Sequence, residues 1–299
     1  MPDIRRATIG DIGDIDRLVR TALNTSSREH GFPEIPPGPP NPFYAFAIAE
    51  EPEGAFVAEE AGAVVGVAVR WLRPPAWFLA HLFVDPRRHG QGHGRRLIER
   101  VLAEGGEDAA FRTLITPAFN PVSISLYMRY GMYPAEPLYA FDAAAAQLRE
   151  RLAGRALLES EILAADADAA PLLGDIDGAL LEMTRAKLHR QLLRLPGIAC
   201  HLFRAAGEGR GYAYVSPRGQ VGPVAALAPL SFPEVFETAL GRAAAISQDR
   251  VGVLLAGSNM AAMAAAVRLQ MRLVRPVLLM ASRRFGDWSR YAPHSPGVM

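Results

Sequence analysis

The chain has 299 residues, half of them apolar, and a net charge of +1 at pH 7. This length favours two domains, because a domain typically takes about 100–200 residues. The small net charge excludes nucleic-acid or membrane-surface binding driven by bulk charge. The only cysteine, Cys200, excludes an intrachain disulfide, and the apolar residues around it predict a thiol in the core.

Two further features bear on where the chain resides. Its first residues lack the apolar stretch of a signal peptide, and no apolar run reaches the roughly 18 residues that a membrane span needs. A single thiol also fits a reducing compartment. We therefore expect a cytoplasmic protein without membrane or nucleic-acid partners.

The first predicted elements are a strand and two helices. Residues 4–8 fit a short strand, and Asp11 can cap a helix whose apolar residues recur at helical spacing over 12–23. A proline-dense loop at 31–42 follows, and loops of this length are often lids or binding loops. A second helix then opens with Phe43, Tyr44 and Phe46.

Strands and helices are predicted in turn over residues 55–141. The pattern indicates a hairpin, a third strand ending at Val84, and then helix, strand, helix and a last strand that can close the sheet. Their ranges are 55–59, 64–71, 77–84, 92–103, 113–117, 122–128 and 134–141. This order favours an α/β (α+β) fold with a mixed sheet flanked by helices.

The segment between Val84 and the helix that begins near Gly92 predicts an anion site. Glycines at 90, 92 and 94 permit backbone conformations that other residues avoid. The unpaired N–H groups of a helix N-terminus favour a phosphate. A nucleotide P-loop is excluded, because Arg95 and Arg96 follow the last glycine in place of Lys and Ser or Thr. The G-x-G-x-G spacing excludes a dinucleotide fingerprint. The structural alternative is a glycine-rich turn without a ligand.

This loop resembles the acetyl-CoA pyrophosphate loop of the GNAT superfamily of N-acetyltransferases, V-x-P-x-x-R/Q-x-x-G-x-G/A. Val84, Pro86, Gly92 and Gly94 match that pattern, and His89 departs from it at the Arg/Gln position. A register that starts at Arg87 and uses Gly90 and Gly92 would restore the arginine.

A second motif of the same family, N-x-x-A/S-x-x-L-Y-x-x-x-G-F, lies downstream. It is matched by Asn120, Ser123, Leu126, Tyr127 and Gly131, with Met132 in place of Phe. Alone, Asn120 would be read as a helix N-cap and Tyr127 as a packing residue. The two motifs occur in the family's order, so the resemblance covers residues 4–141.

The resemblance implies an acetyl-CoA-dependent N-acetyltransferase that needs no metal. Asn120 would reach the pantetheine arm, Tyr127 would protonate the departing thiolate, and a backbone N–H near Phe83 and Val84 would polarise the thioester carbonyl. The residues expected to bind acetyl-CoA are Leu82, Phe83, Val84, His89, Gly90, Gln91, Gly92, His93, Gly94, Arg95, Asn120 and Ser123.

The base that deprotonates the amine stays open. His81 is the first candidate, because an ordinary histidine titrates near neutral pH, but its spacing from Val84 does not fix the face of the strand that it occupies. Glu29, His30 and Glu34 are weaker candidates, and an ordered water chain would need no named base. The aromatic residues and arginines at 43–46 and 70–77 suggest an acceptor with an apolar body and a carboxylate, although such aromatics are more often core.

The second half reads as a faded copy of the first. We predict a GNAT domain over 1–145, a linker over 146–170 and a degenerate GNAT-like domain over 171–299. Asn259 opens a helix as Asn120 does, but Ala266 and Gln270 stand where the first half has Tyr127 and Gly131, and no glycine lies between residues 223 and 240. An unrelated α/β domain is the alternative.

The expected reaction moves the acetyl group of acetyl-CoA to a primary amine of a small molecule by direct attack in a ternary complex. The alternatives are acetylation of a protein or peptide amine, and a CoA-binding sensor without turnover. A mycothiol-type tandem enzyme is disfavoured, because in that family the second domain is the active one, whereas here the intact motif lies in the first half. We expect a monomer or a homodimer.

Overall fold

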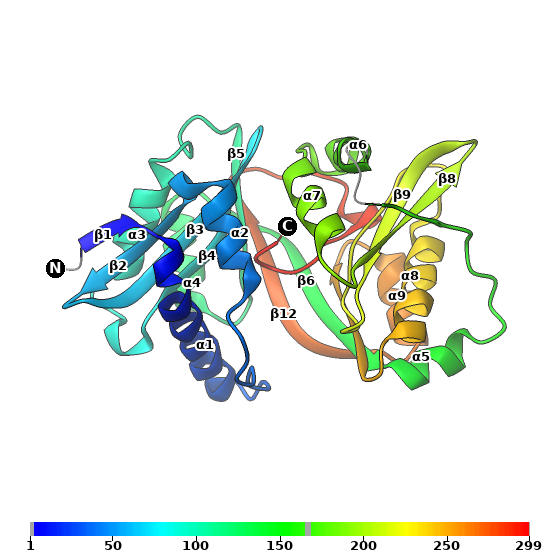
Figure 1. The fold of residues 1–299 in the computed structure, drawn as a ribbon, viewed down its shortest axis with the longest axis horizontal. Helices are drawn as coiled ribbons and strands as arrows, with labels where there is room; N and C mark the ends of the chain where they lie inside the picture. Colours follow the sequence, from blue (N-terminus) through cyan, green and yellow to red (C-terminus); the bar gives the residue numbers. More distant parts are fainter. Residues whose placement is uncertain (1–2, 165–168, 299) are drawn as a thin grey trace. The chain divides into compact units, whose positions relative to one another are not determined.

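A computed structural model describes residues 3–164 and 169–298 (Figure 1). The chain divides into two compact units, Met1–Leu114 and Ile115–Met299. Each unit contains strands and helices, and each is described by itself.

The first unit is built on five strands in the order β1-β2-β3-β4-β5. Neighbours are antiparallel except β4 and β5, which are parallel. The central strands are buried on both faces, which explains their continuous apolar runs. Their bounds are Asp3–Arg6, Ala55–Glu60, Ala63–Arg73, Ala76–Val84 and Phe111–Pro117, of which the last continues past Leu114.

Helices α1 (Ile12–Glu29), α2 (Pro42–Glu50) and α3 (His93–Leu102) belong to this unit, and α1 and α3 pack against β3 and β4. In α3 the apolar residues recur every three or four positions and are buried. Gly66 of β3 allows this close approach, because a Cβ there would lie 2.7 Å from Leu97 Cδ1. Short 3₁₀ turns are η1 (Ile9–Asp11), η2 (Pro52–Gly54) and η3 (Pro86–Arg88).

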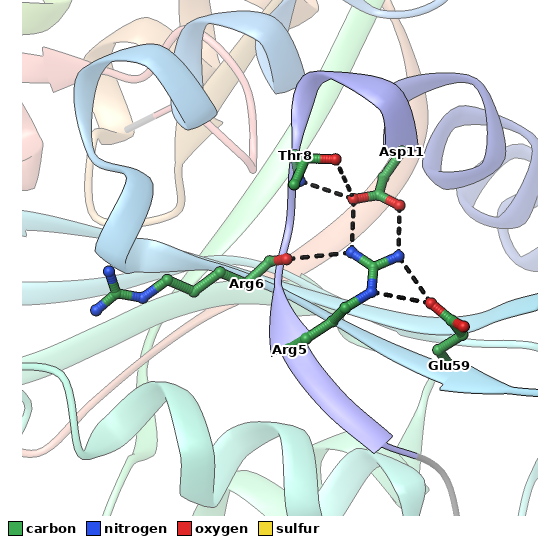
Figure 2. A network of polar contacts seen from close by, with 5 residues as sticks. All are labelled: Arg5, Arg6, Thr8, Asp11 and Glu59. Carbon is green, nitrogen blue, oxygen red and sulfur yellow. Dashed lines mark hydrogen bonds and ion pairs between the residues drawn. The ribbon is translucent and has the colours of Figure 1, made fainter. Parts of the chain in front are cut away.

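An ionic network ties β1 to β2 and to the start of α1 (Figure 2). Arg5 donates to Asp11 through both Nη atoms, at 2.9 and 2.7 Å, and to Glu59 through Nε at 2.9 Å. Asp11 also accepts from the backbone N–H of Thr8 at 2.7 Å. The Arg5 guanidinium therefore holds the pKa of Asp11 well below its usual range, against the opposing effect of burial. Asp11 precedes α1 as predicted, but its carboxylate is engaged by Arg5 and Thr8 and does not cap the helix.

The second unit contains the antiparallel sheet β13-β10-β9-β8-β7 and a group of three strands, β12-β6-β11. The strand bounds are β6 Tyr133–Ala144, β7 Glu161–Ile162, β8 Ala199–Ala205, β9 Glu208–Val215, β10 Val221–Ala226, β11 Arg250–Ala256, β12 Arg272–Ala281 and β13 Tyr291–Ala292. The helices are α4 Pro121–Arg129, α5 Ala145–Leu152, α6 Ala169–Leu181, α7 Ala186–Arg194, α8 Phe232–Ile246 and α9 Met260–Arg268, with the 3₁₀ turn η4 at Trp288–Arg290.

Strand β6 departs from its predicted role as the strand that closes the first sheet. One of its edges pairs with β11 over Leu138–Ala144, and the other pairs with β12 over Tyr133–Asp142. Both partners come from the C-terminal half of the sequence. The next helix, α5, buries Ala145, Leu148 and Leu152 in the same core as α8, so the connecting segment that we predicted over 146–170 begins with a packed helix. The predicted domain boundaries at 145 and 171 stay a prediction, and residues 165–168 lie outside the described residues.

A local repeat is visible within the chain. Strand β11, helix α9 and strand β12 start 139 residues after β5, α4 and β6, respectively. Asn120 and Asn259 each accept a hydrogen bond from the backbone N–H three residues later, at 3.0 and 3.1 Å. Both helices end on a residue with positive φ, Gly131 (73°) and Gln270 (55°). This equivalence supports the prediction of a faded copy over this part of the chain.

Candidate active site

The glycine loop between β4 and α3 has the local structure that an anion site needs. Gly90 and Gly92 adopt left-handed conformations, with φ of 80° and 81°, which is why glycine is required there. Gly92 is the N-cap of α3 and offers no side chain, so the first N–H groups of the helix have no side-chain cap. Asp85 anchors the start of the loop by donating its N–H to the Val65 carbonyl at 2.9 Å.

Five arginines lie on or near this loop, and four of them are neutralised by acids. Arg95 pairs with Glu99 at 2.9 Å. Arg87, Arg88 and Arg100 pair with Asp85, Glu60 and Glu104, respectively. Within residues 3–164 and 169–298, Arg96 has no acidic partner. The sequence carried a signal for this difference, because Arg95 and Arg100 each have a glutamate four residues later, whereas Arg96 has Arg100 there.

The two histidines of the loop differ in their surroundings. His89 is exposed, and its Nε2 donates to the Val84 carbonyl at 3.2 Å, which ties the loop back to the end of β4. His93 is only 4% exposed, and neither ring nitrogen has a partner in the described structure. It lies on the same face of α3 as Leu97 and Val101, so the core face of the helix begins with a buried imidazole.

Strand β4 separates from β5 before either strand ends. The paired residues run from Ala76 to Leu79 on β4, and the strand continues to Val84. On the other edge, the register with β3 shifts between the pairs Arg70–Leu79 and Val69–His81, which leaves Ala80 as an extra residue. Such a β-bulge changes the direction of the next side chains. The free stretch of β4 includes Leu82, Phe83 and Val84, which are all half-buried.

The bulge is followed by His81, whose ring lies in an aromatic cluster. Its Nδ1 is 2.9 Å from the Tyr44 hydroxyl. The ring centroids of Phe43 and Phe83 are 4.4 and 5.4 Å from that of His81. Burial lowers the pKa of His81 to about 4. The imidazole is therefore neutral at pH 7, and its contact with Tyr44 was not predicted.

Two arginines that suggested recognition of a carboxylate are already engaged. Arg70 and Arg73 are 4% and 3% exposed, and both pair with the buried Glu51, at 2.6 and 3.0 Å. Glu51 also accepts the N–H of Leu72 at 2.8 Å. Trp77 is fully buried in the core. The inference of a carboxylate bound by these arginines is therefore wrong, because Glu51 takes that place within the protein.

The proline-dense loop at 31–42 is held against α1. Asn24 makes two hydrogen bonds with the backbone of Ile35, at 2.7 and 3.0 Å. Arg20 donates to the carbonyls of Pro36 and Gly38, and Asp16 accepts the N–H of Asn41 at 2.9 Å. These contacts fix the loop over residues 35–41 and, through Asn41, the start of α2, which carries Tyr44.

The second motif lies in the second unit, on and before α4. Asn120 is the N-cap of the helix, and its Oδ1 accepts the N–H of Ser123 at 3.0 Å. Tyr127 is 6% exposed, and burial raises the pKa of its hydroxyl above the ordinary value. The carbonyl of Tyr127 accepts the N–H of Met132 at 3.2 Å, which closes the helix after Gly131. Asn120 therefore has the capping role, which leaves its amide nitrogen outside the cap.

The strand-to-helix turn before α8, which follows β10 as the glycine loop follows β4, presents carbonyls. Arg290 donates to the carbonyls of Ala226 and Leu230, at 2.7 Å each. Phe232, the first residue of α8, is buried. The turn contains no glycine. An anion cradle of the kind formed by residues 90–94 is therefore absent from residues 226–232.

A buried polar network lies on α6, α7 and β9 of the same unit. Asp177 accepts hydrogen bonds from Arg185 at 2.9 Å, from His189 at 2.6 Å and from the Tyr212 hydroxyl. His189 Nδ1 is 3.0 Å from the Tyr214 hydroxyl. All five residues are at most 1% exposed. Burial opposes ionisation of Asp177, but Arg185 and His189 outweigh it and lower its pKa to about 2.

The described residues contain neither a membrane-spanning helix nor a cluster of metal ligands. No helix there is long and apolar enough to span a membrane. Among the same residues, histidine, cysteine and carboxylate side chains form no group of three or more that could hold a metal ion.

Comparison with known proteins identifies the family of one region of the chain. Residues 20–132 match the family model described as the acetyltransferase (GNAT) family. A comparison with curated proteins finds no significant match. Because the similar solved structures are less than 25% identical, they show the fold alone.

Three of these structures cover nearly the whole chain. A protein assigned to the acetyltransferases from Pyrococcus horikoshii is 17% identical with a TM-score of 0.78, over 100% of this chain and 96% of that one. A GCN5-related N-acetyltransferase from Sphaerobacter thermophilus is 13% identical with a TM-score of 0.63, over 97% and 98%. A tandem GNAT protein from the clavulanic acid biosynthesis pathway is 17% identical with a TM-score of 0.61, over 94% and 98%. Residues 20–132 therefore form a domain of the acetyltransferase (GNAT) family, and the chain as a whole has a fold similar to that of a tandem GNAT protein.

Proposed function

We propose that this enzyme transfers the acetyl group of acetyl-CoA to a primary amine of a small molecule, by direct attack in a ternary complex. The observation that carries the proposal is the loop after β4, where Gly90 and Gly92 are left-handed and α3 begins without a side-chain cap. That geometry suits a pyrophosphate, and the loop lies inside the region that matches the family.

The loop residues divide into backbone and side-chain contributors. We assign the pyrophosphate to the backbone N–H groups of residues 90–95, with His89 positioning the loop through Val84. Arg96 would supply the positive charge for a phosphate of CoA, because Arg95 is already paired with Glu99. The open stretch of β4 at Leu82, Phe83 and Val84 would provide the N–H that polarises the thioester carbonyl.

The chemistry needs one proton removed and one supplied. The neutral amine nitrogen attacks the thioester carbonyl, a C–N bond forms, and the C–S bond of the tetrahedral intermediate then breaks. The amine loses a proton and the departing thiolate gains one. We assign the second transfer to Tyr127, whose raised pKa keeps its hydroxyl protonated at neutral pH. Asn120 and Ser123 would contact the pantetheine arm.

A small-molecule acceptor is supported by the first unit. The half-buried rings of Phe46, His81 and Phe83, with the buried rings of Phe43 and Trp71 against them, form an aromatic cluster suited to an apolar body. The single cysteine supports the cytoplasm as the compartment in which we expect the reaction.

The test combines binding and turnover. Purified enzyme is heated with and without acetyl-CoA, and release of the CoA thiol is followed with a panel of small amines and of peptides with free N-termini or lysines. We expect thermal stabilisation by acetyl-CoA and thiol release that depends on a small amine. If only peptides cause release of the CoA thiol, the acceptor is a peptide or protein amine and the proposed small-molecule acceptor is wrong. Stabilisation without release from any amine would favour a sensor, and absence of stabilisation at saturating acetyl-CoA would refute the site.

A further inference from the structure

The Tyr44 hydroxyl and His81 form a hydrogen-bonded pair with a defined direction. Tyr44 is 1% exposed, and its hydroxyl lies 2.9 Å from Nδ1 of His81. Within the described residues this is its only hydrogen-bond partner. A buried hydroxyl whose proton has no acceptor loses free energy, so the Tyr44 O–H donates to Nδ1.

This direction determines where His81 carries its proton. A neutral imidazole has one donor and one acceptor nitrogen, and the hydrogen bond at one nitrogen sets the state of the other. Since Nδ1 accepts from Tyr44, the ring proton is on Nε2. Nε2 has no partner in the described structure and is not among the buried atoms that lack one, so it is open to solvent.

The surroundings keep this arrangement fixed and uncharged. Phe43 and Phe83 contact the His81 ring, and the bulge at Ala80 sets its direction. Burial lowers the pKa of His81 to about 4. Burial and the nearby Asp16 raise the pKa of Tyr44, so the hydroxyl keeps its proton. The cationic groups closest along the strand pair, Arg70 and Arg73, are neutralised by Glu51.

We propose that Tyr44 is a positioning residue that holds His81 as a neutral Nε2–H donor, and that His81 selects acceptor amines carrying an uncharged oxygen. An amide, ester or hydroxyl oxygen on an aromatic or apolar amine would accept this hydrogen bond. A carboxylate would be disfavoured, because no unpaired cation stands in this cluster to compensate its desolvation. In this arrangement His81 does not take the proton of the amine. The proposal rests on the proposed acetyl transfer and names its acceptor class.

The tautomer is tested without any reaction. Long-range ¹H–¹⁵N NMR of uniformly ¹⁵N-labelled enzyme, with His81 assigned by comparison with His81→Gln, should show a pyridine-type Nδ1 and a pyrrole-type Nε2 that stay unchanged from pH 8 to pH 5.5. In Tyr44→Phe the ring should show mixed tautomers. A protonated Nδ1 in the unsubstituted enzyme, or titration near the ordinary histidine pKa, would overturn the proposal.

Selectivity is tested with three related amines: phenylalaninamide, phenylalanine and 2-phenylethylamine. We expect kcat/KM to be about tenfold higher for the amide than for either of the others, the effect of one hydrogen bond. His81→Gln keeps an N–H donor and should retain most of this preference, whereas His81→Leu should remove it. Equal losses in both variants, with a pH profile that follows a single base, would identify His81 as the base. If no amine is acetylated, the proposed function fails, and the NMR result still decides the tautomer.

Discussion

Two turns in this molecule join a strand to a helix and differ in what they present. After β4, left-handed glycines lead into α3, and no side chain caps the first N–H groups of the helix. After β10, the turn presents carbonyls that Arg290 binds, and α8 opens with the buried Phe232. The order of elements is the same in both places. The anion site therefore depends on the residues of the turn, and a strand followed by a helix does not create it.

The same lesson applies one element later. Helices α4 and α9 share the asparagine cap and the left-handed ending, so the backbone is kept. Ala266 stands at the position equivalent to Tyr127, so the second helix has no hydroxyl there. We propose that the C-terminal copy keeps the residues that shape the backbone here and lacks the hydroxyl that acetyl transfer would use. The following predictions test that division.

The largest effect is expected in the buried network of the C-terminal unit. Asp177→Ala leaves the Arg185 charge buried without its partner, and should lower the free energy of unfolding by about 3–5 kcal/mol. Asp175→Ala is the matched control, because Asp175 is exposed on the same helix, and it should change stability by less than about 0.5 kcal/mol. Urea unfolding measures both. Similar losses of unfolding free energy in the two variants would show that the network does not stabilise the fold.

The next effect concerns turnover. Tyr127→Phe makes the first copy resemble the second by removing the hydroxyl, and should lower kcat about 100-fold, the usual contribution of a general acid, with little change in KM for acetyl-CoA. The exposed Tyr133 supplies the control, Tyr133→Phe, which should leave both constants unchanged. An unchanged kcat in Tyr127→Phe would show that water or another group protonates the thiolate.

Acid should destabilise the protein through Asp177. Its folded pKa of about 2 lies below the ordinary value of about 4. The ionised form therefore contributes stability above about pH 4, and this contribution is lost as the pH falls towards 2. We expect a loss of about 2 kcal/mol over that window, measured by urea titrations at successive pH values. Asp175→Asn should follow the same curve, and a flat curve for the unsubstituted protein would contradict the prediction.

The two asparagine caps separate stability from binding. Asn120→Ala and Asn259→Ala should each lower the free energy of unfolding by about 1 kcal/mol, because each removes an N-cap. The loss at Asn259 should be the smaller of the two, because the substitution also removes a buried Nδ2 that has no hydrogen-bond partner among the described residues. Only Asn120→Ala should raise KM for acetyl-CoA, by about fivefold. An equal rise in both variants would mean that the two copies bind alike.

The smallest effect compares neighbouring arginines. Arg96→Ala should raise KM for acetyl-CoA by about fivefold, and less at high salt, because salt screens the attraction between this half-buried arginine and a phosphate. Arg95→Ala should change it less than twofold, since Arg95 is paired with Glu99. Repeating the assay with 3′-dephospho-acetyl-CoA shows which phosphate is involved. A larger rise of KM in Arg95→Ala than in Arg96→Ala would assign the phosphate contact to Arg95.

Much of this fold was readable from local patterns, because apolar periodicity, proline and glycine report on the chain within a few residues. The strand ending at Val84, helix α3 and the helix that opens at Asn120 were predicted near their observed positions. Ion pairs and strand pairings between residues distant in sequence were not predicted. Glu51 neutralises Arg70 and Arg73, which follow it by 19 and 22 residues, and β6 pairs with strands that follow more than 100 residues later. The face of His81 also escaped prediction, because the bulge at Ala80 interrupts the alternation of the strand.

The pairing of β6 on both edges has a consequence for how such a protein can change over evolutionary time. A gene shortened to end after residue 145 would encode β6 with two unsatisfied edges, and exposed strand edges recruit other chains into aggregates. Mutations in the C-terminal half that spare β11 and β12 leave β6 paired, whereas deletion of that half in one step would expose both of its edges. Selection for these two strands alone would therefore retain the C-terminal half, whether or not it binds a ligand.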